Sequence, residues 1–333
     1  MSGSKNTGRN ESITFFRILF TLVILIHHAS SFPGGHTLLL RGYLCVEFFF
    51  IVSGFFLYRS FRDESRHSTL SFIKKRLVRL YPEYLFAFLV ITASTVVLSR
   101  EFDLNRAVNE LLMVQNTGIF HIGGYNFPCW YIAVMMVSGI LIYNMLSLHE
   151  NAFVKVIAPL IVIGCYTWLT GSEDGFETWT YIGPLSMPLL RGFADMSLGV
   201  ILSAFVEELS PISEKLDLCM ELLALFLIFL GMFTNAAGEV LTVAAFCLLI
   251  LSLTAGENVL SRYMSGRRWI AVAGGYCYSV YLNHGVWVKL FQYLGKRVQI
   301  PFVLLIYLFL VIVYSIFTKW IVDRVIRGIA ERG

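Results

Sequence analysis

Two ionisable side chains, Arg17 and His28, stand eleven residues apart in an otherwise apolar stretch, FRILFTLVILIHHASSF (residues 16–32). At about 100° per residue in a helix, this spacing places both on one helix face, about 16 Å apart along the axis, whereas His27 points about 80° away. Imidazole titrates near neutral pH and is a candidate general base, and guanidinium is a fixed positive charge. In the alternative interpretation, His28 bonds a backbone carbonyl inside a helix bundle and Arg17 extends toward the membrane surface.

An acidic residue, Glu47, follows in GYLCVEFFFIVSGFF, near the middle of the next apolar stretch. A charge inside a span costs at least about 2.5–3.5 kcal/mol on insertion scales, so such a group usually faces a bundle interior and is a functional candidate. We expect its partner to be Arg17 or His28 on the preceding helix. The pair Ser53-Gly54 allows another helix or an extended ligand to approach closely.

Two later segments carry further ionisable groups within apolar stretches. Arg191 and Asp195 in LLRGFADMSLGV are four residues apart, which predicts an intrahelical pair that is structural or orients a ligand. His284 in GGYCYSVYLNHGVW lies near Tyr278 and Asn283 in the sequence. We expect it to form a second polar wall of the same cavity.

A basic segment, FIKKRLVRLYPEY (residues 72–84), places Lys75 and Arg79 at i and i+4, beside Arg76. Basic residues next to a span commonly bind the head groups of anionic lipids, and composition alone favours that interpretation. The alternative is capture of a phosphorylated cytosolic ligand, for which arginine offers bidentate geometry.

The elements that must position these residues are membrane spans. The 333-residue chain is 57% hydrophobic and 14% charged, with a mean hydropathy of +0.70, whereas about a quarter of the residues of a soluble domain are charged. A bilayer core needs about 20 apolar residues per helix, which predicts an all-α integral membrane protein with a first span that is retained. The ten expected spans are about 13–32, 38–58, 81–99, 130–148, 152–170, 187–206, 217–234, 238–254, 268–290 and 301–323.

The distribution of basic residues sets the expected orientation. With the N-terminus in the cytoplasm, the tails, the connections on that side and the span ends that adjoin them hold 18 of the 26 Lys and Arg residues. This asymmetry fits the positive-inside rule and predicts that both termini are cytoplasmic. The expected organisation is a cytoplasmic tail (1–12), one transmembrane domain (13–323) and a second cytoplasmic tail (324–333).

The six cysteines are scattered, without a CxxC pair or metal-ligand spacing. All but Cys129 lie in apolar runs, where small core residues are common. We therefore expect no metal site.

Five motifs occur in a particular order along the chain. Arg17 and His28 come first, followed by VEFFFIVSGF, KRLVRLYP, RGFADMSLGV and YCYSVYLNH. In this order and with these spacings they resemble the membrane acyltransferase 3 family of multi-span bacterial O-acyltransferases. The resemblance runs from residue 13 to about 290. One departure is PCWYIAVMMVSG, which keeps Trp130 but has no acid downstream in the span and is similar to a WYI or WFL variant of some branches.

The resemblance implies transfer of an acyl group, usually acetyl from a coenzyme A thioester, to a hydroxyl of a cell-surface carbohydrate or glycolipid. By the same resemblance, His28 is the catalytic histidine and Arg17 is the partner that it needs. Arg76 and Arg79 are then the basic pair near the acyl donor.

Acyl transfer to a hydroxyl needs a base, a thioester site and a donor or dipole for the developing oxyanion. We expect His28 to deprotonate the acceptor, with Arg17 and Glu47 setting its environment, in a direct transfer without an acyl-enzyme. The coenzyme A phosphates are assigned to Arg76, Arg79 and Lys75. The residues expected to line the acyl or acceptor path are Ser53, Tyr278, His284, Trp130 and Arg191.

The expected co-substrate is acetyl-CoA or another acyl-CoA, and the expected location is a bacterial inner membrane. The other expected partners are the carbohydrate or glycolipid acceptor and membrane lipids, with neither a metal nor nucleic acid. A transporter of a small solute or acyl group is the alternative class, because charges at the midplane also mark transport pathways, although no inverted repeat is evident. A third class is a sensor or scaffold that uses lipid contacts.

Overall fold

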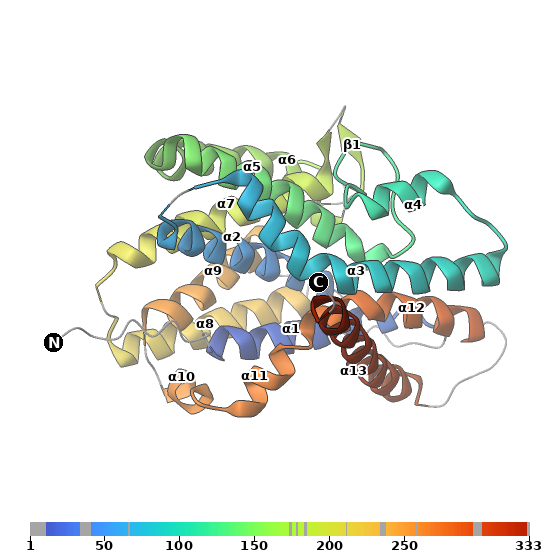
Figure 1. Ribbon diagram of the computed structural model, residues 1–333. Coiled ribbons are helices and arrows are strands. Elements are labelled where there is room, and N and C mark those ends of the chain that lie inside the picture. Colours follow the sequence, from blue (N-terminus) through green and yellow to red (C-terminus); the bar gives the residue numbers. More distant parts are fainter. Residues whose placement is uncertain are drawn as a thin grey trace.

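The computed structural model describes residues 11–33, 41–65, 67–172, 175–177, 179–182, 185–210, 212–233, 238–256, 259–295 and 302–331. This part of the chain is almost entirely helical, which confirms an all-α integral membrane protein (Figure 1). The long and short α-helices are α1 (Glu11–Ala29), α2 (Cys45–Asp63), α3 (Thr69–Ser99), α4 (Leu104–Leu111), α5 (Trp130–Ala152), α6 (Ala158–Thr170), α7 (Met187–Glu208), α8 (Glu214–Phe233), α9 (Glu239–Ala255), α10 (Val259–Met264), α11 (Arg268–Gly274), α12 (Cys277–Gly295) and α13 (Val303–Ala330). The remaining elements are the short 3-10 helices η1 (Gly42–Leu44), η2 (Phe127–Cys129) and η4 (Gly175–Glu177), the π-helix η3 (Phe153–Ile157) and the strands β1 (Tyr181–Ile182) and β2 (Leu185–Ser186).

Seven segments of the described chain are long and apolar enough to cross a membrane. One of them, Phe127–Thr170, contains both α5 and α6. The backbone of His149 leaves helical geometry, and α5 and α6 both pack on α7 (Figure 1). Helix α9 has only 17 residues, and the span expected at 268–290 is divided between α11 and α12. Nine of the ten expected spans thus fall on single helices and the tenth on two, and the count of ten stays a prediction.

Two helices are longer than their expected spans. Helix α3 has 31 residues, about 46 Å at 1.5 Å per residue, against a hydrocarbon core of about 30 Å. The basic segment is thus the first part of the helix that goes on to become a span. Helix α13 continues to Ala330, so most of the expected C-terminal tail is helical, whereas residues 1–10 of the expected N-terminal tail lie outside the described residues.

Helices α2 and α7 are in direct backbone contact at the centre of the bundle. A Cβ atom on Gly54 would lie 2.0 Å from the carbonyl oxygen of Met196, and one on Gly199 would lie 2.1 Å from the carbonyl oxygen of Ile51. Small residues at such points allow the close approach on which helix packing in membranes depends. The close approach expected at Ser53-Gly54 is confirmed, and the neighbour is α7.

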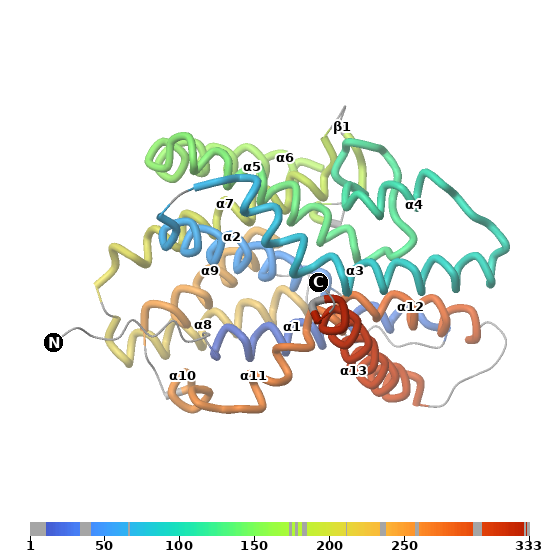
Figure 2. The backbone as a smooth tube through the Cα atoms, in the orientation of Figure 1, coloured from blue at the N-terminus to red at the C-terminus, as the bar shows by residue number. Residues whose placement is uncertain are grey.

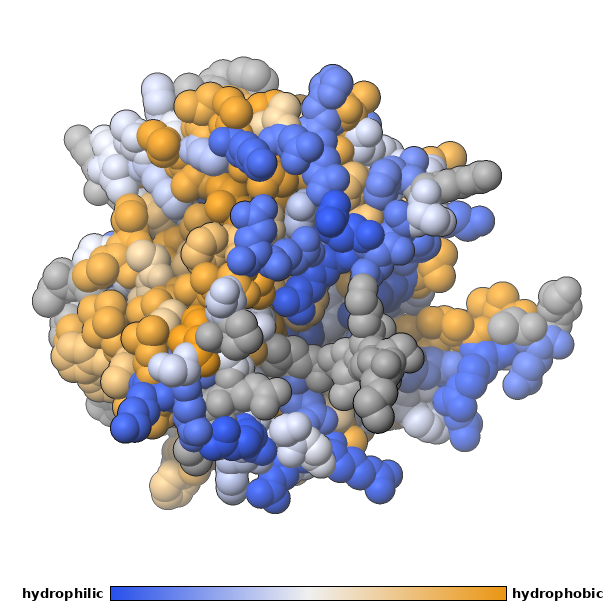
Figure 3. Space-filling model, turned by 90° about the vertical axis from the view of Figure 1, so that its left-hand side faces the viewer, coloured by the Kyte–Doolittle hydropathy of each residue, from blue (hydrophilic) through white to orange (hydrophobic). Residues whose placement is uncertain are grey.

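The two ends of the bundle differ in character. The connections between α2 and α3, α7 and α8, and α9 and α11 form what we call the basic end, at the left of Figure 1. Figure 3 looks onto this end, where hydrophilic residues gather across the middle and right of the face. At the opposite, far end, the chain leaves α3, passes through α4 and returns into α5, as Figure 2 shows.

Candidate active site

Two histidines meet in the half of the bundle nearer the far end. His28 lies at the end of α1 and His284 lies in α12, and their ring centroids are 5.2 Å apart with planes inclined by 24°. Phe127 presents its ring to both, with centroids 5.0 Å from His28 and 5.8 Å from His284. His28 is half-buried and His284 is buried. We call these two residues the histidine pair.

The backbone of α12 fixes the tautomer of His284. Its Nδ1 atom lies 2.6 Å from the carbonyl oxygen of Tyr281, which only accepts hydrogen bonds, so Nδ1 carries the hydrogen. The Nε2 atom is then an unprotonated acceptor. It is buried and has no hydrogen-bond partner in the described part of the chain.

Two tyrosines connect the histidine pair to Ser53 of α2. The Tyr281 ring centroid is 5.5 Å from that of His284 and 5.5 Å from that of Tyr131. The Tyr281 hydroxyl donates to the Pro128 carbonyl at 2.9 Å, which holds its ring in place. The Tyr131 hydroxyl is 3.3 Å from Oγ of Ser53. Ser53, an expected lining residue, therefore contacts this tyrosine wall, formed by Tyr131 and Tyr281.

Three arginines act electrostatically on tyrosines near the histidine pair. Arg17 and Arg76 both act electrostatically on the Tyr131 hydroxyl, and exposed Arg79 acts on that of Tyr278. Within the described residues, none of these three arginines forms an ion pair with a carboxylate. We call them the arginine group. Positive charge gathered without a counter-charge is the arrangement expected where an anionic ligand binds.

Arg191, in contrast, is paired with Glu47. Its Nε atom donates to Glu47 Oε1 at 3.0 Å, its Nη2 atom binds the same oxygen, and both side chains are buried. Asp195 accepts instead from the Tyr166 hydroxyl. The pairings expected from sequence, Glu47 with Arg17 or His28 and Arg191 with Asp195, are therefore corrected. The close contact of α2 with α7 brings the Glu47 carboxylate within reach of the Arg191 guanidinium.

Trp130 covers this ion pair. The Arg191 guanidinium lies 5.2 Å from the Trp130 ring centroid, and Trp179 packs against the same ring at 5.3 Å. Trp130 and Arg191 thus belong to a buried cluster with Glu47. Arg191 also acts electrostatically on Tyr281, so the cluster borders the tyrosine wall.

Lys75 lies apart from the arginine group. Its Nζ atom is 2.8 Å from Oε1 of Glu64, and its side chain is 65% exposed. Hydrogen bonds from Lys75 and Tyr143 lower the pKa of the Glu64 carboxyl. The charge of Lys75 is therefore already balanced at the protein surface.

A family model described as an acyltransferase domain matches residues 10–324. The matched range contains the histidine pair, the tyrosine wall and the arginine group. The chain belongs to the acyltransferase 3 family. It is a multi-pass membrane acyltransferase. A search of curated proteins and a search of solved structures each gave no match.

In this acyltransferase, the segment between α4 and α5 (residues 112–129) brings Phe127 to the histidine pair. The buried Glu110 carboxylate accepts backbone N–H groups from Tyr125 at 2.5 Å and Asn126 at 3.1 Å. Lys289 donates to the Tyr125 carbonyl at 2.7 Å. Burial raises the pKa of Glu110 to about 7, although these N–H groups and Lys289 act in the opposite direction. Glu110 therefore anchors the segment, which we call the strap.

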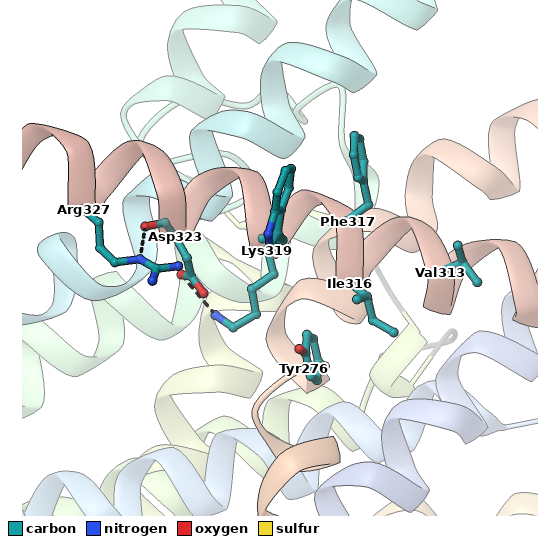
Figure 4. A pocket seen from close by; sticks show the side chains of 8 residues that line it. Tyr276, Val313, Ile316, Phe317, Lys319, Asp323 and Arg327 are labelled. Carbon is teal, nitrogen blue, oxygen red and sulfur yellow. Dashed lines mark hydrogen bonds and ion pairs between the residues drawn. The ribbon is translucent and has the colours of Figure 1, made fainter.

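A groove of about 420 Å³ lies on the acyltransferase away from these residues (Figure 4). Lys319 in this groove forms ion pairs with Glu83 at 2.8 Å and Asp323 at 3.7 Å, so its charge is balanced, unlike that of the arginine group. None of the site residues expected from sequence lines it. Its lining consists of Tyr276, Val313, Ile316, Phe317, Lys319, Trp320, Asp323 and Arg327.

Sequence reasoning missed two residues of the acyltransferase site. Tyr131 follows Trp130 in an apolar span, and a hydroxyl-bearing aromatic in such a span was the available signal. Phe127 had no signal, because it reaches the histidine pair from a segment outside the long helices. Periodicity along a helix carries no information about such an approach.

Proposed function

We propose that this acyltransferase moves an acetyl group from acetyl-CoA, or a related group from another acyl-CoA, to a hydroxyl of a cell-surface carbohydrate or glycolipid. The observation that carries the proposal is the division of the site. The arginine group acts on Tyr131 and Tyr278, whereas the histidine pair contacts the tyrosine wall at Tyr281. A donor with several phosphates complements the first, and a hydroxyl acceptor requires the base that the second supplies.

The donor lies with its phosphates on Arg76 and Arg79, where guanidinium groups offer bidentate hydrogen bonds. Arg17 belongs to the same end of the site, because about 16 Å of helix separates it from His28. Lys75 contributes less to phosphate binding, since its ammonium group already forms an ion pair with Glu64. The pantetheine arm then extends past Ser53 and Tyr278 along the tyrosine wall toward His28.

The reaction is a direct transfer. A ring nitrogen of His28 removes the proton of the acceptor hydroxyl while the hydroxyl oxygen attacks the thioester carbonyl carbon. A carbon–oxygen bond forms, the carbon–sulfur bond breaks, and the departing thiolate takes the proton from His28. Glu47 supports this chemistry from a distance by holding Arg191 beside the tyrosine wall.

The location that fits this reaction is the inner membrane of a bacterium. The basic end then faces the cytoplasm, as the positive-inside rule predicts, and this is the side that supplies acyl-CoA. The acceptor approaches from the far end, where His28 lies. Transfer in this arrangement carries the acyl group across the membrane.

Acetyl-CoA binding tests the donor site. We expect purified protein to bind acetyl-CoA saturably, as measured by isothermal titration calorimetry, and R76A/R79A to bind at least about tenfold more weakly, since each charged hydrogen bond contributes about 1.5–3 kcal/mol. The control K155A/K215A removes the same number of charges from two exposed lysines outside the basic segment and should bind like wild type. Equal weakening in both double variants would indicate unspecific attraction and would count against the proposal. No saturable binding by wild type would favour the transporter class.

A further inference from the structure

The Nε2 atom of His284 is a buried hydrogen-bond acceptor without a donor among the described residues, and it lies beside the ring of His28. Nε2 of His284 is held unprotonated by the hydrogen bond from Nδ1 to the Tyr281 carbonyl, and it is buried without a partner. An unsatisfied buried acceptor is destabilising. We therefore expect Nε2 of His284 to accept a hydrogen bond in another state of the protein, when the substrates are bound or reacting.

The nearest ring with a titratable nitrogen is that of His28. A hydrogen bond of about 2.9 Å between two imidazole nitrogens places the ring centroids about 5 Å apart. The observed separation is 5.2 Å, but the rings are stacked with planes inclined by 24°, and Nε2 has no hydrogen-bond partner in the described chain. The bond therefore forms when a His28 ring rotation brings one of its nitrogens into the plane of the His284 ring. Catalytic hydrogen bonds are often longer in the free enzyme and tighten when substrates bind.

The other groups around His28 do not offer a comparable acceptor. The His27 ring lies 5.2 Å away but is inclined by 62°, and it also faces Tyr43 at 5.8 Å. The Tyr281 hydroxyl donates to the Pro128 carbonyl, and Phe127 has no polar atom. Among the described neighbours of His28, His284 is thus the one whose lone pair is both fixed and free.

We propose that His284 is the positioning residue for His28. When His28 takes the proton of the acceptor hydroxyl on one nitrogen, its other nitrogen donates its N–H to Nε2 of His284. The acceptor hydroxyl then donates to His28, His28 donates to His284, and His284 donates to the Tyr281 carbonyl. His284 does not change its own protonation, because its Nδ1 hydrogen stays on the carbonyl. The proton leaves again with the coenzyme A thiolate.

This inference rests on the proposed function, and variants separate the two. The full chain in proteoliposomes is assayed for coenzyme A release from acetyl-CoA with a panel of methyl glycosides as acceptors. The variants are H28A, H284A, H284Q and H284M, with Y307F as control. Tyr307 has a buried hydroxyl without a partner in the described chain, so its loss removes no hydrogen bond.

We expect H284A and H284M to lower kcat by about 10- to 100-fold, the usual effect of removing the partner that orients a functional histidine. KM for acetyl-CoA should stay within about twofold, because the donor binds at the arginine group. H284Q, whose side-chain carbonyl still accepts from His28, should recover at least about tenfold over H284M. Added imidazole should raise the activity of H284A but not that of H28A.

Two sets of results would contradict these expectations, one for the role of His284 and one for the proposed function. Activity of H284M equal to that of Y307F, or equal loss in H284M and H284Q, overturns the role of His284 while H28A remains inactive. If H284A does not fold, as judged by size-exclusion chromatography, the comparison of H284Q with H284M decides alone. Full activity of H28A, or no transfer by wild type to any glycoside of the panel, instead overturns the proposed function.

Discussion

Glu47 illustrates what a single residue does in this bundle. Its carboxylate is fully buried and binds the Arg191 guanidinium, so loss of either side chain leaves the other charge uncompensated in the membrane domain. Removal of one partner of a buried pair typically costs about 3–5 kcal/mol, whereas replacement of both by apolar residues of similar volume is often neutral. We therefore expect E47M to lower the free energy of unfolding by about 3–5 kcal/mol and E47M/R191M to restore most of it, as measured by thermal unfolding in detergent.

Acyl transfer by the same variants separates the two roles of Glu47. A stable and active E47M/R191M protein places Glu47 in the structure rather than in the chemistry. A stable but inactive double variant would show that transfer needs the Arg191 guanidinium beside the tyrosine wall, which is the supporting role that we assign to Glu47.

The sequence predicts the positions of some single residues but not the partners of others. The eleven-residue spacing of Arg17 and His28 follows from helical geometry, and both lie on α1 as expected. The partner of Glu47 does not follow, because Arg191 is 144 positions away and the pairing depends on the contact between α2 and α7. The i,i+4 rule pointed to Asp195, which lies on the same helix as Arg191, and the rule contains no information about a competing carboxylate from another helix.

At the scale of elements, the contact between α2 and α7 depends on glycine. A Cβ atom at position 54 would lie 2.0 Å from a backbone oxygen of α7, and a backbone cannot yield as a side chain does. We expect G54A to lower the free energy of unfolding by about 1–3 kcal/mol or more, as overpacking does. The matched control is G164A in α6, where nothing lies within 4 Å of the added atom, so G164A should be neutral or slightly stabilising. Equal stability of G54A and wild type would show that the two helices separate readily.

The strap gives a second prediction at this scale, in the pH dependence of stability. The pKa of Glu110 is about 7 in the folded protein against an ordinary value of 4.5, so the folded state favours the protonated carboxyl. Its favourable contribution is fully present below pH about 4.5 and is lost as the pH rises through about 7. We expect the Tm of wild type to fall between pH 5.5 and 8 and the Tm of E110Q to fall less.

Exposed Glu101 provides the control, since E101Q removes the same kind of group from the same end of the molecule. Its Tm should follow that of wild type across the pH range. A wild-type Tm that rises with pH in this interval, or an unchanged slope in E110Q, would contradict the assignment.

Over the whole molecule, composition and charge predicted a membrane bundle, and each expected span contains a helix. The sequence did not predict the break between α11 and α12, where Gly274 packs so closely on α1 that its Cβ would lie 2.2 Å from the Thr14 side chain. Hydropathy records the apolar character of 268–290 but not this turn of the chain. The approach of the strap to the histidine pair is likewise a long-range contact without a periodic signal.

The division of the site along the molecule is the central claim of the account: donor at the arginine group, base at the histidine pair. The most direct measurement is transfer of radiolabelled acetyl from acetyl-CoA, added at the basic end of the protein in proteoliposomes, to a methyl glycoside on the opposite side. We predict labelled glycoside with wild type, a loss of at least about a hundredfold with H28A, the range expected when a general base is removed, and unchanged acetyl-CoA binding by H28A. Labelled glycoside at the wild-type rate with H28A would contradict the account.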